Sequence, residues 1–249
     1  MLQEPMMEKL TAMRLLGMAD ALKTQEQDPS SRELSFLERL GLLVDQQWTW
    51  RENQALARRL HAAKLKGAAV EDIDYRTARG LDKSVIRALA QKSGWVEQHE
   101  NIFVLGPTGV GKSFVACALA QKACRDGYSA LYVRAPALFR DLAIARADGS
   151  LRSVFARFGR IDVLVIDDWA MAPLAETERR DFWEICEDRY QTRSMVLLRN
   201  CQWRAGTSRS ATPPPPTASS IVWCITRIAS KCAAILCARS ALQRANARR

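Results

Sequence analysis

The segment Gly106–Ser113 constrains the fold of this chain more than any other, because it reads G-x-x-x-x-G-K-S. It follows the apolar run Ile102–Leu105, typical of a buried strand, and precedes a helix predicted at Lys112–Arg125. In this context glycines let backbone N–H groups surround phosphates, and the helix N-terminus favours negative charge. The alternative is a chance glycine-rich turn. We predict a phosphate-binding loop (P-loop) for ATP, formed by Gly106, Pro107, Thr108, Gly109, Val110, Gly111, Lys112 and Ser113.

Within this loop, Lys112 is predicted to reach the β- and γ-phosphates, and the Ser113 hydroxyl to ligate Mg²⁺. A second apolar run, Ile161–Ile166, ends in the carboxylates Asp167 and Asp168. This Walker B arrangement predicts that Asp167 holds Mg²⁺ and that Asp168 orients the attacking water, which makes Lys112 and Asp168 the catalytic candidates. An ordinary turn or N-cap acid after a strand is the alternative for Asp167.

Strands alternate with helices from Asn101 onward, which predicts an α/β fold with a parallel sheet in three layers. Lys112 and Asp167 lie 55 residues apart with a further strand between them. That spacing suits the ATPase branch in which an extra strand separates the two motifs. The predicted strands are 102–105, 130–133, 161–166 and 194–197, and the predicted helices are 112–125, 137–147 and 177–190.

The N-terminal part reads as helical, with helices at residues 6–26 and 33–66, a connector at 68–80 and a short helix at 81–92. Ser30 and Glu33 have capping-box spacing, and Gly67 is the expected stop of the second helix. The later half of that helix is basic. We predict DNA contacts there, because Lys and Arg neutralise phosphates, whereas a solvated helix face is the alternative; the candidates are Arg51, Arg58, Arg59, Lys64 and Lys66.

Composition excludes two broad classes of protein. The 249 residues are 48% apolar and 26% charged, as in ordinary globular chains, and no apolar run approaches the length of a membrane span. The N-terminus lacks the pattern of a signal peptide. Seven cysteines without CxxC pairs and only two histidines give neither a metal-ligand pattern nor a disulfide framework. We therefore expect a cytoplasmic protein without a membrane partner.

The net charge of +10 belongs to the end of the chain. Residues 1–188 carry 26 Lys and Arg against 27 Asp and Glu, whereas residues 189–249 carry 11 against none. Four of the seven cysteines and the run Pro213–Pro216 also lie in that last part. The basic balance therefore describes the tail and says little about the folded body.

Three stretches resemble the IstB-like ATP-binding proteins, helper ATPases of insertion-sequence transposition that are related to DnaC-type helicase loaders within the AAA+ class. They are Phe36–Leu40 through Ala57–Leu60, Gly106–Ser113 leading into Ala116–Leu119, and Leu164–Trp169. The resemblance covers residues 1 to about 197. It implies Mg²⁺-dependent ATP hydrolysis, double-stranded DNA and a transposase as partners, and assembly into oligomers.

We accordingly predict four parts. Residues 1–80 form an N-terminal helical, DNA-binding region, and residues 81–94 form a linker helix. Residues 95–198 form the P-loop ATPase core of AAA+ type. Residues 199–249 form a basic tail that is non-native and disordered.

The tail prediction rests on the point where the resemblance stops. The family continues with Thr-Ser after the fourth strand, whereas Leu198-Arg199-Asn200 follow here. Read one base out of register, codons for Thr207–Pro213 can encode His-Glu-Gln-Ile-Gly-Asp-Pro, which is typical of the family's C-terminal region. We hypothesise a frameshift near Leu198; a genuine basic tail is the alternative.

Such a shift would remove the Thr-Ser that senses the γ-phosphate, and also the arginines from which AAA+ proteins draw their finger. Nucleotide binding would survive, but hydrolysis and assembly would be impaired. Two other functions stay open, a DnaC-like helicase loader and a non-hydrolysing ATP- and DNA-binding remnant. A metabolite kinase is disfavoured by the paired Asp167 and Asp168 and by the absence of an evident acceptor site.

Overall fold

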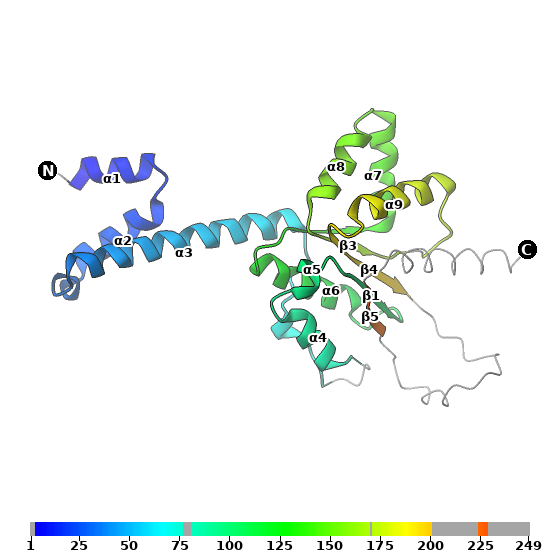
Figure 1. Cartoon of the computed structure of the whole chain (residues 1–249), viewed down its shortest axis with the longest axis horizontal. Coiled ribbons are helices and arrows are strands. Elements are labelled where there is room, and N and C mark those ends of the chain that lie inside the picture. Colours follow the sequence, from blue (N-terminus) through cyan, green and yellow to red (C-terminus); the bar gives the residue numbers. More distant parts are fainter. Residues whose placement is uncertain (1–2, 77–80, 170, 201–223, 229–249) are drawn as a thin grey trace, which may run out of the picture. The chain divides into compact units, whose positions relative to one another are not determined.

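The computed structural model describes residues 3–76, 81–169, 171–200 and 224–228 and divides the chain into two compact units, Met1–Arg58 and Arg59–Arg249 (Figure 1). The helices are α1 (Gln3–Ala12), α2 (Leu16–Gln27), η1 (Pro29–Arg32), α3 (Phe36–Ala63), η2 (Val70–Asp72), α4 (Lys83–Ala90), α5 (Gly94–Glu97), α6 (Lys112–Arg125), α7 (Ala135–Ala147), α8 (Leu151–Arg160) and α9 (Glu176–Arg189). The strands are β1 (Asn101–Gly106), β2 (Ala130–Arg134), β3 (Val163–Asp167), β4 (Ser194–Asn200) and β5 (Cys224–Ile228).

The first unit is helical, and a glycine sets how closely two of its helices approach. A Cβ on Gly17 of α2 would lie 2.6 Å from the Cβ of Trp50 on α3. Beside this contact the backbone N–H of Met18 donates to Gln47 Oε1 at 3.0 Å. The side chain of Gln47 is buried, so this bond satisfies a polar group inside the unit.

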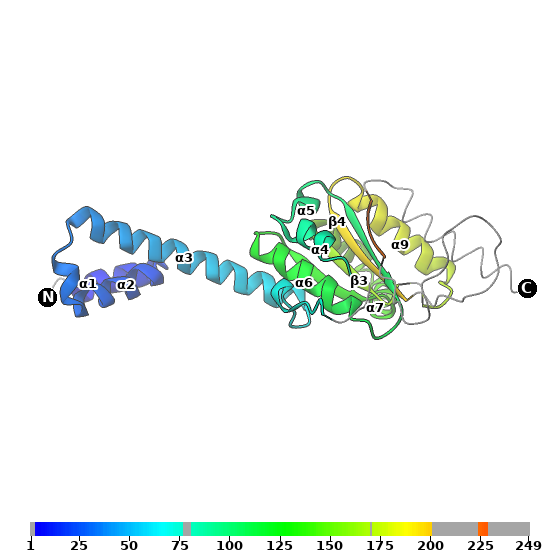
Figure 2. The same ribbon diagram turned by 90° about the horizontal axis from the view of Figure 1, so that it is seen from below.

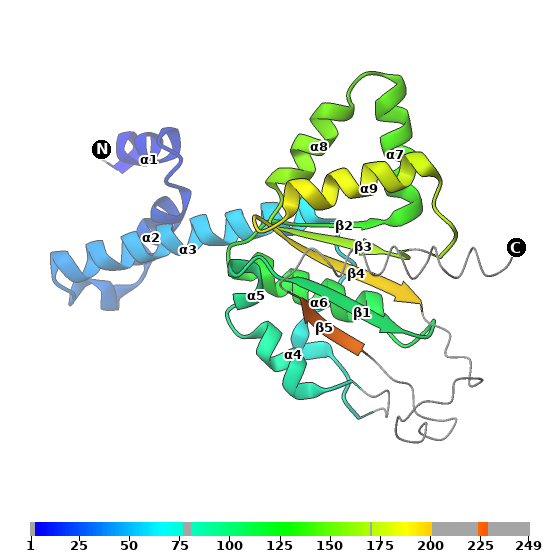
Figure 3. The same cartoon turned by 45° about the vertical axis from the view of Figure 1, so that its right-hand side comes forward.

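The second unit is built on a sheet of order β2-β3-β4-β1-β5 (Figure 3). The first four strands are parallel, and β5 runs antiparallel to β1. β4 lies between β1 and β3, which confirms that an extra strand separates the two predicted motifs. The strand between the motifs along the chain is β2, and it lies beyond β3 at the edge of the sheet.

Helices cover both faces of this sheet, so the predicted three-layer α/β fold is confirmed (Figures 1 and 2). α6 and α4 lie on one face, and α7, α8 and α9 lie on the other. All five residues of β3 are buried, as expected for a parallel strand that is covered on both sides. A core cluster on the α7–α9 face includes Leu138, Phe155, Leu164, Ile185 and Leu197.

A buried arginine joins the elements at the amino edge of the sheet. The Arg189 guanidinium, on a residue that is 2% exposed, donates to the carbonyls of Phe158, Ile161, Asp162 and Ser194. Burial lowers the pKa of Arg189 to about 10, so the group stays charged at neutral pH. One side chain therefore ties α8 to the starts of β3 and β4.

The first unit differs from the sequence prediction at two helix starts. The helix predicted at residues 6–26 is two helices, because Arg14 adopts a left-handed conformation with φ of 59° between α1 and α2. The capping box is formed by Ser35 and Glu38, not by Ser30 and Glu33. Ser30 instead donates its hydroxyl and its N–H to Asp28, which caps η1.

The second unit adds elements that the sequence pattern did not predict. α8 was missed although Phe155 and Phe158 bury one of its faces, and α3 ends at Ala63 rather than at Gly67, with Lys64 left-handed after it. In the tail, Cys224–Ile228 form β5, which pairs with β1 along Asn101–Leu105. At these five tail residues the prediction of disorder is wrong. The other tail residues lie outside the described part of the chain.

We expect Arg189→Met to lower the free energy of unfolding by about 3 kcal/mol, because it leaves four buried carbonyls without their charged donor. Chemical denaturation measures the change. Arg180→Met is the matched control on the same helix, since the Arg180 side chain is 76% exposed and pairs with the exposed Glu176. We expect about 0.5 kcal/mol or less for that control. Equal effects of the two substitutions would contradict the role given to Arg189.

Candidate nucleotide-binding site

The P-loop connects the buried end of β1 to the first residue of α6. Gly109 and Gly111 have φ angles of +86° and +95°, in the left-handed region that favours glycine. A Cβ on Gly109 would meet no atom within 4 Å, so the backbone conformation rather than space requires glycine there. The sequence therefore folds locally into a loop that ends at the N-terminus of a fourteen-residue helix.

Lys112, the first residue of α6, lies inside this loop. The residue is 7% exposed, and its Nζ donates to the carbonyl of Pro107 at 2.6 Å. A buried ammonium needs such a partner, because desolvation without one is costly. The geometry keeps a positive charge within the loop at the helix N-terminus, where phosphate groups are favoured.

Ser113 and Asp167 meet although 54 residues separate them along the chain. The Ser113 hydroxyl donates to Asp167 Oδ2 at 2.6 Å, and Asp167 is 5% exposed at the end of β3. The backbone N–H of Asp168 donates to Asp167 Oδ1 at 2.8 Å. The two residues predicted to hold Mg²⁺ are thus adjacent, with the carboxylate oriented by hydrogen bonds on both oxygens.

Tyr132 is a site residue that the sequence reasoning missed. Its hydroxyl donates to Asp167 Oδ2 at 2.6 Å from the neighbouring strand β2. Burial and then the bond to Asp167 raise the pKa of the Tyr132 hydroxyl above its usual range, so the group is a proton donor at neutral pH. Only the β2–β3 pairing brings the two together, and no local motif signals it.

The turn after β3 fixes the position of Asp168. This residue is half-buried with φ of 56°, a left-handed conformation that aspartate tolerates better than most residues. The next residue, Trp169, donates its backbone N–H to the Leu198 carbonyl at 2.9 Å and stacks on Phe182 with ring centroids 3.7 Å apart. Contacts with β4 and α9 therefore hold the backbone on which Asp168 sits.

The end of β4 lies beside the P-loop. Asn200 pairs in register with Gly106, and its Nδ2 lies 2.9 Å from Met171 Sδ. The strand thus continues three residues beyond the predicted end at Leu197. A polar side chain occupies the end of this strand in place of the Thr-Ser that the family resemblance implies.

The five predicted DNA contacts have different surroundings. Arg51 and Arg58 are exposed on α3 and lie seven residues apart, on one face of the helix. Arg59 Nε donates to the carbonyl of Cys124 at 3.0 Å. Lys64 is exposed, and Lys66 Nζ lies 5.3 Å from the centroid of the Tyr132 ring. Arg59 and Lys66 therefore make contacts within the second unit.

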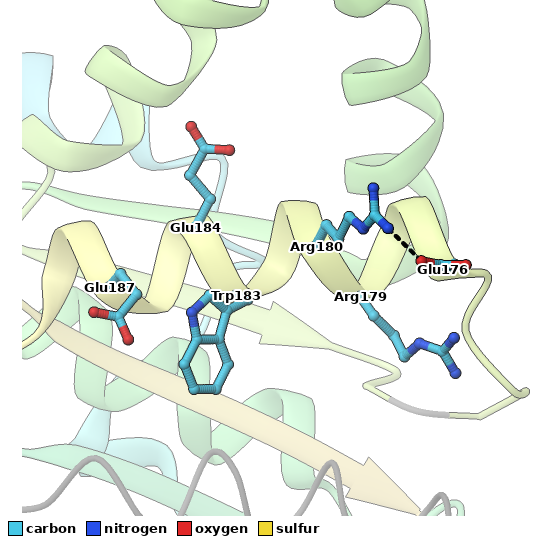
Figure 4. Close-up of a pocket in the computed structure, with 6 residues that line it drawn as sticks. All are labelled: Glu176, Arg179, Arg180, Trp183, Glu184 and Glu187. Atoms are coloured by element: carbon cyan, nitrogen blue, oxygen red, sulfur yellow. Dashed lines mark hydrogen bonds and ion pairs between the residues drawn. The ribbon is translucent and has the colours of Figure 1, made fainter.

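A shallow hollow on α9 is separate from the loop (Figure 4). An ion pair joins Arg180 to Glu176, and the indole of Trp183 is 48% exposed. No residue of the P-loop or of the turn after β3 lines the hollow, so it is not part of the candidate nucleotide site. Its lining residues are Glu176, Arg179, Arg180, Trp183, Glu184 and Glu187.

The residues present fit a magnesium nucleotide. Mg²⁺ prefers oxygen ligands, and the Ser113 hydroxyl and the Asp167 carboxylate supply them side by side. Left-handed glycines, an interior ammonium and a helix N-terminus suit phosphate groups. Among the described residues, no helix combines the length and the apolar character that crossing a membrane requires.

Together, the parallel sheet, the extra strand between the two motifs and the loop before α6 define the P-loop fold of the AAA+ class. The chain belongs to the family of IstB-like ATP-binding proteins, whose family model matches residues 8–208. The chain is 44% identical over 225 residues to an ATP-binding protein of insertion sequence IS1162 from Pseudomonas fluorescens, covering 90% of this chain and 97% of that protein. It is 46% identical over 198 residues to the insertion sequence ATP-binding protein y4pL of Sinorhizobium fredii, covering 79% and 80% of the two chains.

Among solved structures, a DNA replication initiation factor is similar with a TM-score of 0.50 and 18% identity, covering 55% of this chain and 43% of that one. At this identity the likeness concerns the fold. The DnaC helicase loader has a TM-score of 0.45 and 18% identity, covering 59% and 82% of the two chains.

Proposed function

We propose that this chain binds ATP with Mg²⁺ at the P-loop and supports the transposition of an insertion sequence by coupling ATP hydrolysis to binding of double-stranded DNA and a transposase. The observation that carries the proposal is the bond of 2.6 Å between Ser113 and Asp167, which joins the P-loop to the end of β3. The names of the relatives support transposition rather than helicase loading.

Each side chain of the site then has a distinct task. The P-loop backbone and the Lys112 ammonium bind the phosphates, and Ser113 and Asp167 hold the cation. When bound, Mg²⁺ neutralises phosphate charge as it develops during hydrolysis. Asp168, held by the turn before Trp169, orients the attacking water and accepts its proton. Oligomeric assembly belongs to this function, because AAA+ proteins draw an arginine finger from a neighbouring subunit.

A frameshift near Leu198 remains our hypothesis for the tail, and it implies that hydrolysis is impaired in this copy. The absence of acidic residues after Asp188 supports it. The alignment with the P. fluorescens protein counts against it, because an alignment that covers 90% of the chain extends past residue 198 wherever it begins. With a frameshift, the chain is an ATP- and DNA-binding remnant.

For nucleotide binding, we expect Lys112→Ala to weaken ATP affinity about 10- to 100-fold, because a charge-assisted phosphate contact is lost. Asp168→Asn is expected to keep ATP affinity and to lower hydrolysis about 100-fold or more, as loss of a general base does. Lys122→Ala, on the same helix but paired with Asp126, is the matched control. Calorimetry measures the affinities, and phosphate release with and without DNA measures turnover. Unchanged ATP affinity in Lys112→Ala would refute the site.

For DNA binding, we expect the double substitution of Arg51→Ala and Arg58→Ala to reduce the slope of log affinity against log salt concentration by about 2, because each phosphate contact contributes about 0.9. Fluorescence anisotropy with a labelled duplex measures the slope. The control replaces the exposed Arg140 and Arg180 of the second unit. A slope that changes equally in both double variants would place the DNA contacts elsewhere.

For the tail, we expect the coding DNA to lack one base near codon 198. Restoring an adenine there would give Leu-Thr-Ser-Gln and an acidic continuation, and hydrolysis is expected to rise in the restored protein. Sequencing the gene from its source DNA decides the matter. An intact frame, found again in an independent copy of the gene, would reject the frameshift and make the basic tail native.

A further inference from the structure

Tyr132 shares one carboxylate oxygen with the P-loop serine. The Tyr132 hydroxyl and the Ser113 hydroxyl each lie 2.6 Å from Asp167 Oδ2, and both donate to it. The third donor, the backbone N–H of Asp168, occupies Oδ1. Tyr132 is 9% exposed and Asp167 is 5% exposed, so water has little access to the bond between them, whereas Ser113 is half-buried.

These three donors determine the plane of the Asp167 carboxylate. The terminal torsion of an aspartate side chain normally adopts a broad range of angles. Hydrogen-bond donors on both oxygens restrict that rotation in Asp167. With its proton committed to Asp167, the Ser113 hydroxyl keeps its lone pairs for a cation. Tyr132 occupies the second acceptor position of Oδ2, so this oxygen stays directed toward Ser113.

Lys66 holds the other side of the phenol ring. Its ammonium lies 5.3 Å from the ring centroid, within the range of a cation–π contact. The backbone N–H of Lys66 also hydrogen-bonds the buried thiol of Cys117, which lies four residues after Ser113 on α6. The segment that follows α3 is therefore fastened both to Tyr132 and to the helix that carries Ser113.

We propose that Tyr132 is a positioning residue for the magnesium site, holding the Asp167 carboxylate toward Ser113, and that Lys66 fixes the Tyr132 ring in place. This inference rests on the proposed function, because it assigns the cation to Ser113 and Asp167. Tyr132 contacts neither nucleotide nor cation in this role and acts only through Asp167. The contact also joins the segment after α3 to the Walker B carboxylate.

The test is the Mg²⁺ concentration needed for tight binding of a fluorescent ATP analogue. Tyr132→Phe is expected to raise the midpoint of the Mg²⁺ titration about tenfold, because it removes one hydrogen bond to a charged group. Binding of the analogue in EDTA is expected to stay unchanged. Lys66→Met is expected to raise the midpoint about threefold. Tyr128→Phe, which removes a half-buried hydroxyl just before β2, is the matched control with no expected shift.

The outcomes separate the inference from the function on which it rests. If the wild-type protein binds the analogue without Mg²⁺ dependence, the proposed function fails. If the wild-type protein depends on Mg²⁺ and Tyr132→Phe has the same midpoint, only the role of Tyr132 is overturned. If Tyr132→Phe weakens binding of the analogue equally with and without Mg²⁺, Tyr132 has only a structural role, and its role as a positioning residue is overturned as well. Lys66→Met changes an exposed residue. If the midpoint of its Mg²⁺ titration is unchanged, the role of Lys66 in fixing the Tyr132 ring is overturned, even if Tyr132→Phe does not fold.

Discussion

One buried carboxylate oxygen, Asp167 Oδ2, joins three elements that are distant in sequence. It accepts hydrogen bonds from Ser113 of α6 and Tyr132 of β2, and it lies at the end of β3. An ionised carboxylate is costly to bury without such donors. The same bonds that compensate its burial also fix the distance between the P-loop helix and the strand end. The stability of this edge of the sheet and the position of Asp167 beside Ser113 therefore depend on the same hydrogen bonds.

This arrangement follows from sheet topology. Parallel strands present their carboxyl ends at one edge, and here β1, β4, β3 and β2 bring the P-loop, Asn200, Asp167 and Tyr132 to that edge. At the opposite edge, Arg189 donates to carbonyls of α8, of the residues just before β3, and of β4. The hydrogen bonds of Arg189 thus lie at the amino edge of the sheet, and the candidate site residues lie at its carboxyl edge.

Features that a motif encodes were predictable from the sequence, whereas Tyr132 and β5, which depend on strand pairing without a motif, were not. α6 has the predicted bounds, because glycines and the helix start are encoded within a few residues. The meeting of Ser113 with Asp167 followed from the paired motifs. Tyr132 escaped prediction because its role arises from the pairing of β2 with β3, which leaves no mark in its own neighbourhood. β5 was not predicted for the same reason, because it pairs with β1 from a position more than one hundred residues later in the chain.

The residues of the candidate site, from Lys66 to Asp168, all precede the tail that begins after Leu198. The side-chain contacts of the site run from Lys66 to Asp168, and in β4 the backbone carbonyl of Leu198 accepts a hydrogen bond from the N–H of Trp169. A backbone carbonyl is the same in either reading frame, so the turn that carries Asp168 does not depend on which frame is native. The identity of the side chains at Arg199 and Asn200 does depend on it, and Asn200 pairs with Gly106 at the start of the P-loop. Under the proposed function, the residues that bind the nucleotide therefore all precede Leu198, and the side chains that differ between the two reading frames follow it.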